Sequence, residues 1–294
     1  MSSTTTLITG LAIGESPRWH EGRLFISDMG ANELRATTGD PVDGTELVAA
    51  IPGMPMGTGW LPAPDGRMLI VSSRDGKLLR REEDGTLVTH ADLAGVSKFP
   101  WSDMVVDGRG NAYVGSIGFD FPFGEVAPGI LALITPDGTV TQVADGIEFP
   151  NGVAVTPDNR TLILAESYGR RLTAFGIADD GTLSGRRVWA DLGDGVPDGI
   201  CLDAEGAVWY ADVPNKRCVR VREGGEVLQT IDLDRGGFAC MLGGEDGRTL
   251  FMVAAEWRGM EQAAEVMKQK TGRVLAAPAP APGAGWPGPG PRSA

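Results

Sequence analysis

Short apolar segments, each introduced by a polar turn, recur along nearly the whole chain. Typical copies are EGRLFIS from Glu21 and DNRTLILAES from Asp158. Runs of this kind, rich in aliphatic and aromatic residues and bounded by Gly, Asp or Asn, predict β-strands. The 43 glycines and 20 prolines agree with many turns between such strands. The pattern therefore predicts an all-β protein with little helix.

The turn and strand pattern repeats six times at a nearly constant spacing. The last turn residues before the six strands are Gly22, Gly66, Gly110, Asn159, Gly206 and Gly247. Successive copies are 44, 44, 49, 47 and 41 residues apart, a period typical of propeller blades. A second hairpin follows each of the first five copies, which gives four strands per blade. We predict a six-bladed β-propeller.

The two ends of the propeller are expected to meet in one blade. The sixth copy is completed only by GRVLAA, at residues 272–277, after an insertion of helical composition over residues 256–270. The N-terminal segment TTTLITGLA has no partner in the first blade, so we expect it to pair with the last blade and close the ring. We expect one propeller domain over residues 1–277. The remainder, residues 278–294, is rich in Pro, Gly and Ala and predicts a disordered tail.

Composition and charge exclude several classes of partner. The net charge of −13 is opposite to the cationic surface that nucleic acids and anionic membranes require. No stretch approaches the roughly 18 apolar residues of a membrane span, and the N-terminus lacks a secretory pattern. The three cysteines form no CxxC pair and are expected to be buried thiols. We expect a cytoplasmic protein that acts on a small molecule, and the sequence carries no signal for an oligomeric state.

Acidic and amide residues stand just before the inner strands of several blades. They are Glu15 in the first blade, Asp103 in the third, Asn151 in the fourth and Asp198 in the fifth. Inner strands surround the propeller axis, so these side chains are expected to converge at one end of the channel. Crowded carboxylates repel one another unless a cation compensates their charge. Oxygen ligands favour a hard cation such as Ca²⁺, Mg²⁺ or Mn²⁺, whereas Zn²⁺ usually takes His or Cys.

The same residues also have a simpler explanation. PNG and PDG are common turn sequences, and Asn and Asp often cap turns through their own backbone. Their occurrence at equivalent positions of several blades favours a functional role over turn chemistry alone. The two histidines, His20 and His90, lie outside these segments, which argues against a Ser-His-Asp triad at the axis.

Four longer motifs resemble the gluconolactonase, regucalcin and luciferin-regenerating enzyme family. They are ESPRW at Glu15, SDMVVDGRGNAYVG at Ser102, FPNGVAVTPDNRTLILAES at Phe149 and PDGICLDAEGAVWYAD at Pro197. The resemblance extends from about residue 8 to residue 277. It implies a six-bladed propeller that binds one divalent cation on its axis and hydrolyses lactones. The implied cation is Ca²⁺, with Mg²⁺, Mn²⁺ or Zn²⁺ as alternatives.

The resemblance also implies roles for individual residues. Glu15, Asn151 and Asp198 match the family's metal ligands, and Asp198 matches its usual candidate base. A carboxylate bound to a metal is a weaker base, because its charge is already engaged. Asp103 is therefore a second candidate for taking the proton from the attacking water.

The third blade departs from the family pattern. Ser102 stands where the family usually has Asn, and Pro100 stands where regucalcin-like members have an Arg that holds a sugar. Aromatic and other apolar residues lie nearby in the sequence, which favours a pocket for a less polar lactone or ester. The candidate substrate contacts are Ser102, Trp101, Phe119, Phe121, Phe149 and Met56. Each apolar residue among them has an equally good explanation as packing between blades.

Three other functions remain open at this point. The first is phosphotriester hydrolysis at the same metal site, with an Asp as nucleophile, as in relatives of the family. The second is a propeller that binds a ligand but has lost turnover, since a fold does not determine a function. The third is a metal-free condensation of the strictosidine synthase type, which would not need three oxygen ligands.

Overall fold

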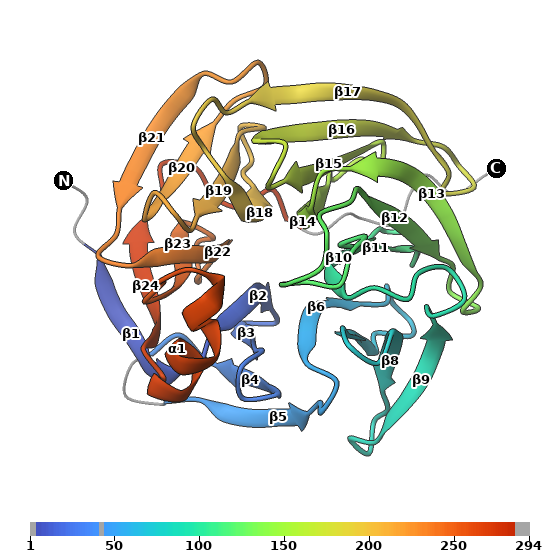
Figure 1. Ribbon diagram of the computed structural model, residues 1–294, viewed down its shortest axis with the longest axis horizontal. Coiled ribbons are helices and arrows are strands. Elements are labelled where there is room, and N and C mark those ends of the chain that lie inside the picture. Colours follow the sequence, from blue (N-terminus) through green and yellow to red (C-terminus); the bar gives the residue numbers. More distant parts are fainter. Residues whose placement is uncertain (1–3, 41–43, 286–294) are drawn as a thin grey trace.

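The computed structural model describes residues 4–40 and 44–285, and it confirms the six-bladed β-propeller (Figure 1). Each blade is a four-stranded antiparallel sheet. The inner strands are β2 (Gly14–His20), β6 (Pro55–Trp60), β10 (Trp101–Val106), β14 (Pro150–Val155), β18 (Pro197–Leu202) and β22 (Gly236–Gly243). The second strands are β3 (Arg23–Asp28), β7 (Met68–Ser72), β11 (Ala112–Ser116), β15 (Thr161–Glu166), β19 (Val208–Asp212) and β23 (Thr249–Ala255).

The two outer layers complete the blades. The third strands are β4 (Glu33–Thr37), β8 (Lys77–Arg81), β12 (Gly129–Ile134), β16 (Arg171–Ile177), β20 (Arg217–Val221) and β24 (Gly272–Pro278). The outermost strands are β5 (Glu46–Ala50), β9 (Leu87–Asp92), β13 (Val140–Ile147), β17 (Leu183–Asp191), β21 (Val227–Asp232) and β1 (Thr5–Leu11). The N-terminal strand β1 pairs antiparallel with β24, so the predicted closure of the ring in the last blade is confirmed.

The core lies between the blades rather than within one sheet. Every residue of the second strands β7, β11 and β19 is buried, because both faces of these strands are covered by neighbouring blades. Between the second and third blades, Leu69, Val71, Met104 and Val114 pack in one cluster. Burial on both faces explains why the sequence shows continuous apolar runs instead of strict alternation.

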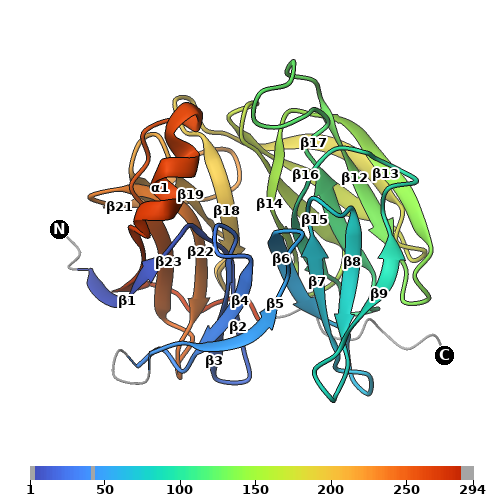
Figure 2. The same ribbon diagram turned by 60° about the horizontal axis from the view of Figure 1, so that its bottom comes forward.

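The insertion in the last blade is helical, as its composition predicts. It contains a short 3₁₀ turn, Met260–Gln262, and the helix α1, Ala263–Gln269. Val266 of α1 is buried against Ile13 and Phe238. Figure 2 shows α1 and the loop between β11 and β12 at the same end of the propeller. No helix in the described residues is long and apolar enough to cross a membrane.

The segment that follows β24 does not leave the fold at once. Ala279 N donates to Arg248 O, Gly283 N donates to Gly247 O, and Ala284 N donates to Leu202 O at 3.0 Å. The prediction of a disordered tail from residue 278 is therefore wrong for the part that ends at residue 285. Backbone hydrogen bonds hold this part although it has little apolar side-chain surface. Residues 286–294 lie outside the described part of the chain.

Candidate active site

The strand register explains why the predicted site residues come together. In four blades the first paired residue of the inner strand faces the last residue of the second strand, and a register shift follows directly. The next residue on each of these inner strands is therefore equivalent from blade to blade, and these residues are Met56, Ser102, Asn151 and Asp198. In the first blade the shift follows Glu15, which is itself paired, so Glu15 stands at the start of its bulge. These four residues and Glu15 are here called the axial ring, and the bulges bring their side chains of different chemistry toward the axis.

Glycines next to the axial ring allow the inner strands to approach one another closely. A Cβ on Gly152 would lie 2.5 Å from Ile200 N and 2.6 Å from Asp198 O. A Cβ on Gly57 would lie 2.3 Å from Met104 N. Since no side chain fits at such distances, glycine is required where one bulge meets the next. Asn-Gly at residues 151–152 is thus an inner-strand bulge and not a hairpin turn.

Two carboxylates of the axial ring share an unfavourable environment. Burial raises the pKa of Glu15 well above its ordinary value, and the neighbouring charges of Asp198 and Asp103 raise it further. Burial likewise raises the pKa of Asp198 well above its ordinary value. A hydrogen bond from the Asn151 side chain opposes that rise, whereas the charge of Asp103 adds to it. The four predicted polar residues therefore lie close enough to interact strongly.

Asp198 also has an unused acceptor. Its Oδ1 atom is buried and has no hydrogen-bond partner among the described residues. An acceptor buried without a partner is costly, so a polar or cationic ligand at this atom would stabilise the site. The orphaned Oδ1 is thus the atom at which a ligand is expected.

Asn151 is oriented by a short hydrogen-bonded chain. Its Nδ2 donates to Ser167 Oγ at 3.3 Å, and Ser167 Oγ donates to Pro197 O at 2.7 Å. Since the amide nitrogen is engaged, the amide oxygen is left to act as a ligand. The described residues contain no group of three His, Cys, Asp or Glu side chains that could hold a metal. Together with Glu15 and Asp198, the Asn151 oxygen would give a cation at the axis three protein ligands.

Asp103 forms a buried ion pair with Arg18, a residue that the sequence motifs did not single out. Arg18 Nη2 lies 2.6 Å from Asp103 Oδ1, and both side chains are almost completely buried. The same oxygen accepts hydrogen bonds from Ser16 Oγ at 2.9 Å and Met104 N at 2.8 Å. The available signal was the position of Arg18 within ESPRW, three residues after the first candidate ligand. One oxygen of Asp103 is thus fully engaged.

The charges of this region fit a divalent cation. Three carboxylates, those of Glu15, Asp103 and Asp198, face one guanidinium, that of Arg18. Their formal net charge is −2, which one divalent cation would neutralise. Hard oxygen donors are the ligands that Ca²⁺ and Mg²⁺ prefer.

The predicted aromatic contacts divide into two groups. Trp101 is completely buried in the core between the second and third blades and has no surface at the channel mouth. Phe119, Phe121 and Phe149 pack in one cluster with Tyr168, where the Phe149 and Tyr168 ring centroids are 4.5 Å apart. This aromatic cluster adjoins Asn151, since Phe149 precedes it by two residues.

The other two predicted contacts belong to the axial ring. Ser102 is 2% exposed. Met56 is partly buried and packs against the core between the second and third blades. The roles of both in substrate binding stay predictions.

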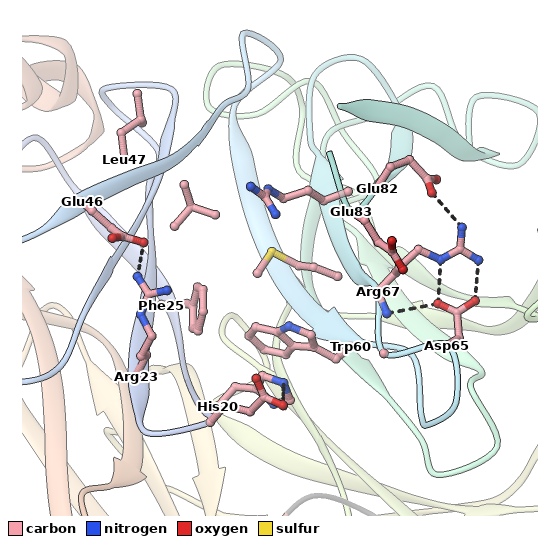
Figure 3. Close-up of a pocket in the computed structure, with 15 residues that line it drawn as sticks. His20, Arg23, Phe25, Glu46, Leu47, Trp60, Asp65, Arg67, Glu82 and Glu83 are labelled. Atoms are coloured by element: carbon pink, nitrogen blue, oxygen red, sulfur yellow. Dashed lines mark hydrogen bonds and ion pairs between the residues drawn. The ribbon is translucent and has the colours of Figure 1, made fainter. Parts of the chain in front are cut away.

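A separate groove lies between the first and second blades (Figure 3) and has a volume of about 360 Å³. Two of its three arginines are paired within the groove: Arg23 with Glu46, and Arg67 with Asp65 and Glu82. No residue of the axial ring lines it. The groove is therefore not part of the candidate site.

Comparison with known families agrees with the motifs and the geometry. The family described as SMP-30/Gluconolactonase/LRE-like region matches residues 13–256. The chain belongs to this family. The family match spans all four polar residues of the site.

Individual members of the SMP-30/gluconolactonase family align along most of their length. The chain is 26% identical over 278 residues to pentonolactonase XacC from Haloferax volcanii, covering 90% of this chain and 89% of the relative. A luciferin-regenerating enzyme structure matches with a TM-score of 0.82 and 18% identity over 99% of both chains. The structure of a calcium-binding protein, regucalcin from Agrobacterium tumefaciens, matches with a TM-score of 0.79 and 21% identity. This match covers 99% of this chain and 98% of the regucalcin chain. The two structures support the fold.

Proposed function

We propose that this protein is a lactone hydrolase that depends on a divalent cation. The observation that carries the proposal is the buried, unpartnered Asp198 Oδ1 beside Glu15. Membership of the gluconolactonase family and the relative named as a pentonolactonase support lactones as the substrate class.

The residues present fit one cation, with Ca²⁺ favoured. Glu15, Asp198 and the side-chain oxygen of Asn151 would hold it, and the relative named as a calcium-binding regucalcin supports this choice. A bound cation supplies positive charge that stabilises the oxyanion formed during attack on a carbonyl.

Asp198 is the base in this proposal. Its buried Oδ1 atom has no hydrogen-bond partner among the described residues, so this oxygen is free to accept a proton from water. It would take a proton from water while the water oxygen attacks the lactone carbonyl carbon. The ring C–O bond then breaks, the proton passes to the leaving oxygen, and a hydroxy acid is released. Asp103 is a weaker candidate, because one of its oxygens already accepts three hydrogen bonds.

Removal of divalent ions is expected to abolish turnover. Chelator-treated protein should release little acid from sugar, aliphatic and aryl lactones, and added Ca²⁺, Mg²⁺, Mn²⁺ or Zn²⁺ should restore the release. A pH indicator measures it, with Na⁺ as the control ion. Equal rates before and after chelation would refute the metal dependence, and no hydrolysis of any lactone with metal bound would refute the proposed reaction.

The substrate is proposed to be less polar than a sugar lactone. The support is the aromatic cluster of Phe119, Phe121 and Phe149 near the axial ring, together with Ser102 in place of the family's Asn. A serine offers fewer hydrogen-bonding groups to substrate hydroxyls than an asparagine does.

The substitution Ser102→Asn tests this preference. It should raise kcat/KM for a sugar lactone, relative to an alkyl lactone, by about five-fold, because one added net hydrogen bond is worth about 1 kcal/mol. Steady-state rates on the two substrates give the ratio, and Ser102→Ala is the control. An unchanged ratio in Ser102→Asn would show that residue 102 does not select the substrate.

A further inference from the structure

The ion pair between Arg18 and Asp103 links two blades that are not neighbours. Arg18 lies on β2 of the first blade and Asp103 on β10 of the third, with the second blade between them. Arg18 Nη2 also donates to Met104 O at 2.7 Å, and Nη1 donates to Pro17 O at 3.0 Å. Buried ion pairs often add little net stability. Stability alone therefore does not explain an arginine at this place.

Arg18 separates the axial ring from an apolar cavity at the other end of the channel. That cavity, of about 260 Å³, is lined by residues from the far ends of the inner strands, such as Val105, Val155 and Leu202. Among the described residues that line it, Arg18 is the only Lys or Arg. Within the described part of the chain, the guanidinium is thus the one permanent positive charge that lines this cavity next to the acidic ring.

The positive charge of Arg18 acts on the carboxylates of the axial ring. Its charge lowers the pKa of Glu15, in opposition to the raising effects of Asp198 and Asp103. Loss of the Arg18 charge would leave three uncompensated carboxylates, whereas loss of the Asp103 charge would leave a formal net charge of −1. Arg18 and Asp103 together therefore set the net charge of the site, and with it the charge of the cation that the site prefers.

We propose that Arg18 is a positioning residue that fixes Asp103 and sets the charge of the site, so that the site prefers a divalent to a trivalent cation. This inference rests on the proposed cation site, but it does not require lactone turnover. Ca²⁺ and Tb³⁺ have similar radii, so their affinity ratio reports charge more than shape.

The experiment measures Ca²⁺ and Tb³⁺ affinities of the metal-free protein by calorimetry and terbium luminescence. Arg18→Met should raise the Tb³⁺ to Ca²⁺ affinity ratio by about ten-fold, and Asp103→Asn should lower it by about as much, since a unit charge acts more strongly on the trivalent ion. The double variant, with net charge −2 again, should return to within about three-fold of the wild-type ratio.

A second buried pair provides the matched control. Arg220 and Asp203 lie 2.6 Å apart with similarly small exposure, in the fifth blade and outside the axial ring. Arg220→Met should lower stability but leave the ion ratio unchanged. If Arg18→Met does not fold, Arg18→Lys, which keeps the charge and should keep the ratio, and Asp103→Asn carry the test.

The outcomes separate this inference from the proposed function. An unchanged ratio in Arg18→Met and Asp103→Asn, or a double variant whose ratio stays about ten-fold away from wild type, would overturn the role of Arg18. Failure of the wild type to bind either ion would overturn it as well. If the Tb³⁺ to Ca²⁺ affinity ratios change as predicted but the protein hydrolyses no lactone, the role of Arg18 is supported and the lactonase proposal is contradicted.

Discussion

Asp198→Asn is expected to lower lactone hydrolysis by about 1,000-fold or more while the propeller stays folded. Asparagine keeps the shape of the side chain but neither accepts a proton as a base nor supplies charge to a cation. Loss of general base catalysis alone costs about 10²- to 10⁴-fold, and a weaker cation site adds to that loss. Initial rates of proton release at saturating Ca²⁺ measure the effect.

The control for this substitution lies in the same blade. Asp232 is exposed at the end of the outermost strand β21, so Asp232→Asn removes the same charge from the protein without touching the axis. Its rate should stay within about two-fold of wild type, because exposed substitutions are usually neutral. Full activity in Asp198→Asn would instead assign the proton transfer to another group, with Asp103 as the next candidate.

The fold could be predicted because the same pattern of turn and apolar strand recurs in each blade. The turns at Gly22, Gly66 and Gly110 recur at 44-residue intervals, and such a regular repeat leaves few alternatives to a propeller. The candidate ligands Glu15, Asn151 and Asp198 could be selected for the same reason. Asn151 and Asp198 stand at one repeated position, the inner-strand bulge, and Glu15 stands at the start of the bulge in its own blade.

Features without a repeat could not be predicted in this way. The partner of Arg18 is 85 residues away in a blade that does not adjoin its own, and no periodicity links the two. Trp101 precedes Ser102 on one strand, and successive strand residues point to opposite sides. Its indole therefore enters the core while Ser102 belongs to the axial ring. Composition alone also could not reveal the backbone hydrogen bonds that hold Ala279 and Ala284.

Gly152→Ala is expected to lower the free energy of unfolding by about 2–4 kcal/mol and to weaken cation binding. The added methyl group would meet Ile200 N at 2.5 Å, Asp198 O at 2.6 Å and Gly199 Cα at 2.8 Å. All three atoms belong to the backbone of the next inner strand, so no side chain can rotate away. Relief of the clash requires β14 and β18 to separate, which moves Asp198 away from Asn151. Urea denaturation and Ca²⁺ calorimetry measure the two effects.

The matched control is Gly176→Ala in the same blade. Its added methyl group would meet nothing closer than Ser184 Oγ, at 3.6 Å, which is ordinary contact. Neither glycine requires a left-handed backbone, so each alanine alone should stabilise the chain by about 0.4–1 kcal/mol through the unfolded state. The free energy of unfolding of Gly176→Ala should therefore equal or slightly exceed that of the wild type. Any loss of stability in Gly152→Ala then measures the close contact between β14 and β18. Equal stability of the two variants would mean that the inner strands can separate at little cost, and that their close approach does not hold Asn151 and Asp198 together.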